Sequence, residues 1–113
     1  MTLEYKEQNL GFEFGLYFLG KAQGFLGYSD FNELLQSLKT RADIVELMYV
    51  SAMTYAKIEK KPFDISLRDW INAFESNEIE ATKITEFEGL FVESIEGAFG
   101  IEKDNVDDTS KKK

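Results

Sequence analysis

The sequence predicts an all-α fold of about five helices packed around a central helix over residues 43–59. In several segments, apolar residues recur at the i, i+3, i+4 and i+7 spacing of an amphipathic helix. The central segment, by contrast, is apolar on more than one face, as expected of a helix that neighbours cover on several sides. A length of 113 residues fits one domain of ordinary size, so we expect a single core.

Alternating apolar residues mark the N-terminal segment, residues 1–14. Leu3 and Tyr5 stand on either side of Glu4. From Leu10 on, apolar residues again occupy every second position, up to Phe14. This period is typical of a half-buried strand. The segment therefore forms either a short β-hairpin with Gln8-Asn9 as its turn, or an extended arm that leads into the first helix.

A segment rich in aromatic residues and glycine follows, from Phe12 to Leu26. A helix buried against the central one accounts for part of its apolar surface. Contact with another chain is the alternative for the rest, because aromatic side chains are enriched at interfaces. Since the other amphipathic faces already supply a core, this surplus predicts four protein-binding residues, namely Phe14, Tyr17, Phe18 and Phe25.

The next two helices have clear start signals. Asp30 precedes Glu33 by three residues, as in a capping box, and opens a leucine-rich amphipathic helix. Thr40 or Asp43 can cap the central helix, and Pro62 prevents its continuation. The two apolar stripes of the central helix are Ile44, Leu47, Met48, Ser51 and Tyr55, and Val45, Met48, Ala52 and Ala56.

Two further helices complete the predicted fold. Ser66 caps a short one, in which we interpret Trp70 as a core anchor. The last helix begins at Ala81 or Thr82 and ends at Phe99, with Gly100 as its C-cap.

Acidic residues concentrate in the C-terminal part of the chain. The net charge is −8, and the segment from Glu75 to Asp108 alone contributes −9 with its eleven acidic and two basic residues. This distribution argues against nucleic acid and anionic membranes as partners, since both attract clustered lysine and arginine. The charged residues 102–113 cannot bury enough apolar surface to stay ordered, so we expect one helical domain over 1–101 and a disordered tail over 102–113.

The chain has neither cysteine nor histidine. It therefore has no disulfide framework, no thiolate metal site and none of the common nucleophile–histidine pairs. No phosphate-binding loop or cation-binding loop is present either, so we expect a protein that is not an enzyme and uses no cofactor or metal. No apolar run is long enough to span a membrane, which favours a cytosolic protein.

Taken in order, these features resemble the tail assembly chaperones of long-tailed siphophages, the small proteins that accompany the tape measure protein. The resemblance rests on the aromatic run Phe12-Glu-Phe-Gly15, a central helix rich in Ala, Met and Tyr, and a break at Lys60-Lys-Pro62. Ser66-Leu-Arg-Asp-Trp-Ile71 then begins a helix, and an acidic helix and a charged tail finish the chain. The resemblance covers nearly the whole sequence and includes no catalytic motif.

The resemblance implies a non-catalytic protein that binds and solubilises the tape measure protein during tail assembly. It would act in the cytoplasm of the infected bacterial host, as a homo-oligomeric ring or open helical array, and would be absent from the mature virion. The tail tube protein is a second candidate partner, because tube subunits replace such chaperones on the tape measure protein. In this family the reading frame often ends near a ribosomal slip site, and Lys111-Lys-Lys113 is either a trace of one or an ordinary charged terminus.

Two other functions stay open from the residues alone. An acidic inhibitor that mimics the charge of DNA would need carboxylates spaced along one surface, for which Glu86, Glu93 and Glu96 offer a short stretch. A structural adaptor is the other alternative.

Overall fold

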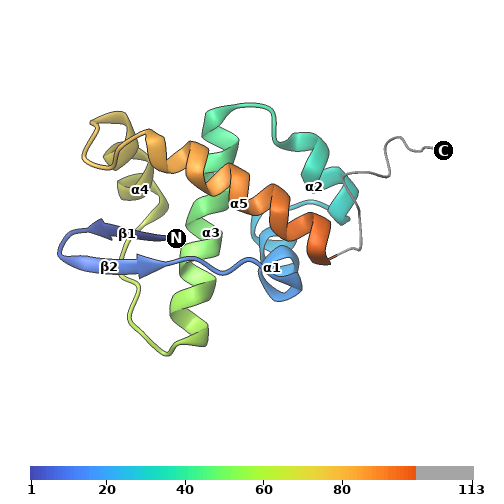
Figure 1. Ribbon diagram of the computed structural model, residues 1–113, viewed down its shortest axis with the longest axis horizontal. Coiled ribbons are helices and arrows are strands. Elements are labelled where there is room, and N and C mark those ends of the chain that lie inside the picture. The colour runs from blue at the N-terminus through green and yellow to red at the C-terminus, as the bar shows by residue number, and fades with distance from the viewer. Residues whose placement is uncertain (99–113) are drawn as a thin grey trace.

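Five helices and one two-stranded antiparallel sheet make up residues 1–98, the part of the chain that the computed structural model describes (Figure 1). The elements are β1 (Thr2–Tyr5), β2 (Gln8–Gly11), α1 (Leu16–Leu26), α2 (Phe31–Ser37), α3 (Arg41–Ile58), α4 (Leu67–Glu75) and α5 (Thr82–Ala98). The fold is thus mainly α, as predicted. The N-terminal segment forms the hairpin and not the extended arm. The predicted tail over 102–113, the cap at Gly100 and the end of the predicted domain lie outside the described residues.

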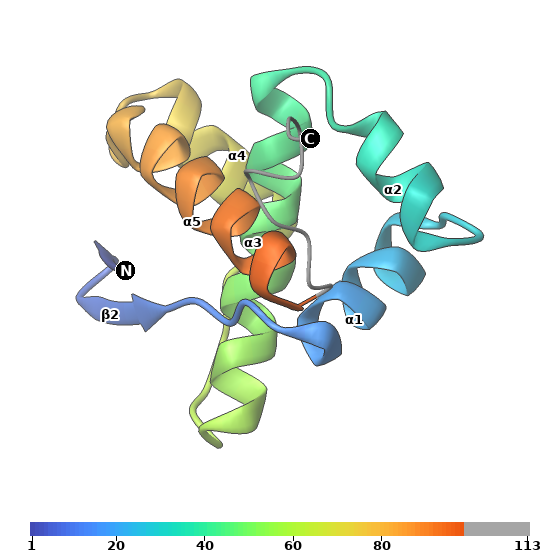
Figure 2. The same ribbon diagram turned by 45° about the vertical axis from the view of Figure 1, so that its right-hand side comes forward.

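Helix α3 is the centre of the fold. Helices α1, α4 and α5 and strand β2 all pack against it, and Figure 2 shows it passing through the middle of the molecule with α1 and α5 beside it. Leu47, Met48 and Val50 are fully buried, although they point to different sides of the helix. One hydrophobic cluster joins these side chains to buried residues of every other element.

We expect Thr40→Ala to lower the free energy of unfolding by about 1 kcal/mol, because two reciprocal hydrogen bonds cap the start of α3. The amide of Asp43 donates to Thr40 Oγ1 (3.2 Å), and the amide of Thr40 donates to the Asp43 carboxylate (2.9 Å). Urea unfolding followed by circular dichroism at pH 7 measures the loss. Thr85→Ala, at an exposed position within α5, is the control, and a loss no larger than the control's would contradict the cap.

The same cap makes stability depend on pH. A hydrogen bond from the backbone amide of Lys39 lowers the pKa of Asp43 below its ordinary value of 3.8. The stabilisation by this carboxylate is therefore complete above pH 3.8 and is lost as the pH falls through the lower pKa of the folded state.

The hairpin turns at Lys6-Glu7, so the prediction of a turn at Gln8-Asn9 is wrong. Tyr5 pairs with Gln8 across a two-residue loop, and both loop residues have positive φ, 51° and 64°. Such a left-handed pair matches the twist of the flanking strands, but it is usually built from Asn and Gly.

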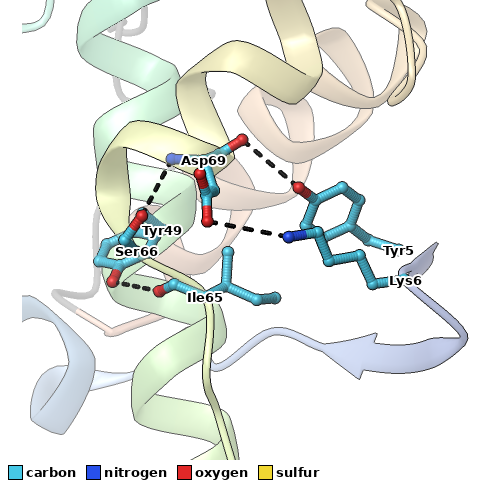
Figure 3. Close-up of polar contacts among 6 residues, drawn as sticks. All are labelled: Tyr5, Lys6, Tyr49, Ile65, Ser66 and Asp69. Atoms are coloured by element: carbon cyan, nitrogen blue, oxygen red, sulfur yellow. Dashed lines mark hydrogen bonds and ion pairs between the residues drawn. The ribbon is translucent and has the colours of Figure 1, made fainter.

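Contacts with α4 hold this turn in place. Figure 3 shows Tyr5 and Lys6 reaching Asp69: Tyr5 Oη donates to the Asp69 carbonyl (3.5 Å), and Lys6 Nζ lies 3.7 Å from Asp69 Oδ2. The hairpin also buries Leu3 and Leu10, which face each other across the strands, in the common core. Packing of this kind allows the short hairpin to form, since two strands alone are marginal in water.

Aromatic rings join the segment after β2 to α5. Phe87 lies 5.7 Å from Phe12 and 5.1 Å from Phe14 between ring centroids, and Phe18 meets Phe91 edge-on at 6.1 Å. Ser94 Oγ also donates to the carbonyl of Phe14 (3.0 Å). Much of the aromatic surplus predicted from the sequence is therefore used inside the molecule.

Candidate functional site

The four predicted protein-binding residues divide between the core and the surface. Phe18 is fully buried, so the prediction of a contact role for it is wrong: its ring belongs to the core between Phe14 and Phe91. Phe14 is half-buried against the same core. Tyr17 and Phe25 are each 48% exposed, and they alone of the four are large exposed side chains.

Tyr17 and Phe25 line one groove between α1 and α3, with a volume of about 490 Å³. We call it the α1/α3 groove. Its residues are Tyr17, Gly20, Lys21, Gly24 and Phe25 of α1, and Met53, Thr54 and Lys57 of α3. Phe25 leans on the buried ring of Tyr49 (centroids 6.0 Å apart), whose hydroxyl donates to the Ile65 carbonyl (2.6 Å). Burial raises the pKa of Tyr49, so this supporting hydroxyl stays neutral at physiological pH.

Two glycines leave the groove open on the α1 side. A side chain placed at Gly20 or at Gly24 would meet no atom within 4 Å. The opposite face of α1 packs inward through Phe18, Leu19 and Ala22. Glycine costs a helix about 1 kcal/mol relative to alanine, and here its lack of a side chain leaves room for another chain to approach the α1 backbone. The spacing of four between these glycines was the sequence signal for the groove.

The groove has a positive rim on an acidic protein. Lys21 lies on the α1 wall and Lys57 on the α3 wall. Lys21 Nζ is 5.2 Å from the centre of the Tyr17 ring, and among the residues that the structure describes neither lysine forms an ion pair.

A second apolar depression, of about 410 Å³, lies where α3, α4 and α5 meet. The sequence did not indicate it, because apolar residues in a helix stripe, such as Val45, are expected in the core. Its rim carries Arg41 together with Glu46 and Glu75, so its charge is mixed. Among the described residues, the large exposed apolar side chains do not line it, whereas two of them line the α1/α3 groove.

The described residues contain no group of three or more carboxylates that could hold a metal ion. No helix among them is both long and apolar enough to cross a bilayer. Comparison with protein-family models, with curated proteins and with solved structures finds no match for this chain. Among the described residues, the α1/α3 groove combines exposed aromatic rings with the apolar side chain of Met53.

Proposed function

We propose that this protein is a non-catalytic tail assembly chaperone of a long-tailed phage, which binds and solubilises the tape measure protein in the host cytoplasm. The single observation that carries the proposal is the α1/α3 groove, which is lined by two half-exposed aromatic rings, Tyr17 and Phe25. The resemblance described above supplies the identity of the client.

The chemistry of the groove supports a helical client. A tape measure protein is long and helical, and an apolar stripe along it would aggregate in water. A groove of this size covers a short piece of such a stripe in helix-in-groove fashion. Tyr17 and Phe25 supply apolar area at low entropy cost, and Met53 adapts to irregular side chains.

One groove buries little surface, so a single contact is weak. Many copies can cover one rod, each on its own piece of the stripe, while each copy stays exchangeable. Weak individual contacts also suit a chaperone that tail tube subunits must displace. Self-association into a ring or open array would hold these copies together before the client is made.

The decisive experiment is co-expression of the full chain with the tape measure protein from the same genome. We expect the double variant Tyr17→Ser/Phe25→Ser to leave that protein in the insoluble fraction, as if no chaperone were present, while its own helicity is unchanged. Both side chains are half-exposed, so their loss costs the fold little. The control is Leu16→Ser/Ile58→Ser, which removes two similarly exposed apolar side chains that do not line the groove.

Three outcomes would contradict the proposal. The first is a soluble tape measure protein with the groove variant. The second is a client that binds but stays insoluble, which favours a structural adaptor. The third is a preference for DNA-binding enzymes that disappears at about 0.5 M salt, which favours the acidic inhibitor, since charge mimicry is screened by ions. Binding of an apolar helix should tolerate that salt.

A further inference from the structure

Helix α5 presents a narrow exposed ridge on its outer side. Thr85, Gly89 and Val92 follow one another at helical spacing along it, and Val92 is 48% exposed. A side chain placed at Gly89 would meet no atom within 4 Å, so the middle of the ridge is low. Glu88 lies on one flank and Glu93 on the other, both exposed. We call these five residues the α5 ridge.

The α5 ridge cannot reach the groove of its own chain. Phe87 and Phe91 lie on the opposite side of the helix and hold it in the core. In Figure 1, α5 accordingly lies across the front of the fold, over α3. In the part of the chain that the structure describes, Thr85, Gly89 and Val92 are exposed, so another molecule can reach the ridge.

The α5 ridge and the α1/α3 groove carry opposite charges on either side of small residues. The ridge has a slim uncharged centre between two carboxylates, and the groove has a glycine floor between two lysines. Thr85 and Val92 are small enough for close approach to the α1 backbone. Two copies with a net charge of −8 repel each other overall, so a stable contact needs local pairing of this kind.

We propose that the α1/α3 groove of one copy binds the α5 ridge of a second copy. Lys21 and Lys57 would face Glu88 and Glu93 across the contact, with Val92 against Tyr17 and Phe25. The two surfaces differ, so the contact is head-to-tail and propagates into a ring or an open filament. Each open assembly keeps one unfilled groove at one end.

The contact makes self-association and client binding compete for the same groove. The contact between copies is inferred from the opposite charges and small residues of the two surfaces. Only the competition with the client rests on the proposed function. The ridge of one copy would occupy the groove of the next until a client helix displaces it. The assembly would therefore release copies with free grooves as the client concentration rises.

Paired charge reversals test the contact. We expect Lys21→Glu/Lys57→Glu and Glu88→Lys/Glu93→Lys each to weaken self-association of the full chain at least tenfold, measured by analytical ultracentrifugation. Mixing the two variants should restore association, because each reversed surface then finds an opposite charge on the other chain. Circular dichroism of each variant checks that its helices are intact.

Restored association in the mixture would support the contact and exclude misfolding as the cause. Three results would overturn it: a wild-type chain that stays monomeric at millimolar concentration, a ridge reversal without effect, or a mixture that fails to associate. Solubilisation of the tape measure protein is measured in the separate co-expression experiment. A chain that solubilises its client as a monomer therefore ends the contact while leaving the proposed function in place.

Discussion

Trp70→Ala should be the most destabilising single substitution, with an expected loss of about 3–5 kcal/mol in the free energy of unfolding. The side chain is fully buried and makes ring contacts with Phe12, Tyr49 and Phe74 at centroid distances of 6.5, 6.0 and 5.6 Å. Its Nε1–H also donates to the Val45 carbonyl on α3 (3.0 Å). Removing it opens a cavity where the segment after β2, α3 and α4 meet. Since a domain of this kind is stable by roughly 5–15 kcal/mol, much of that stability would be lost.

Trp70→Phe separates packing from the hydrogen bond. Phenylalanine keeps most of the ring contacts but has no donor for Val45, so we expect a loss of about 1–2 kcal/mol. Urea unfolding followed by circular dichroism and by near-ultraviolet absorbance measures both variants. An alanine variant that loses less than the phenylalanine variant would mean that Trp70 is not the anchor of this core.

The helices could be predicted because their signals are local. Asp30 and Ser66 cap α2 and α4 as predicted, each accepting a hydrogen bond from the backbone three residues on. The hairpin turn could not be located in this way. Lys6 and Glu7 carry no turn signal, and the strand pairing and the contact of Lys6 with Asp69, far along the chain, hold them in a left-handed conformation.

The site was predictable only in part, for a similar reason. Consecutive apolar residues at the start of α1 make its rotation ambiguous from sequence. Phe18 points inward because Phe91 lies there to receive it, and this turns Tyr17 outward. The α3 wall of the groove was missed because Met53 and Lys57 are ordinary residues of a central helix until α1 is placed beside them.

Filling the groove should change stability and binding in opposite directions. We expect Gly24→Leu to raise the free energy of unfolding by about 0.8 kcal/mol, since leucine is a far better helix former than glycine and a side chain there meets open space. The same leucine would occupy the floor of the groove between Tyr17 and Phe25. Binding of a tape measure helix should then weaken by at least roughly thirtyfold, or about 2 kcal/mol, as for loss of an interface anchor.

A damaged fold would lower the stability, so it cannot explain a variant that is more stable and yet binds more weakly. A fluorescence-labelled tape measure peptide, titrated with the protein, measures affinity, and urea unfolding measures stability. Asn72→Leu is the matched control, because it adds the same side chain at an exposed position of α4 outside the groove. If Gly24→Leu binds the peptide as tightly as Asn72→Leu does, the client docks elsewhere on the molecule. If both substitutions weaken binding equally, the added leucine acts through solubility and not through the groove.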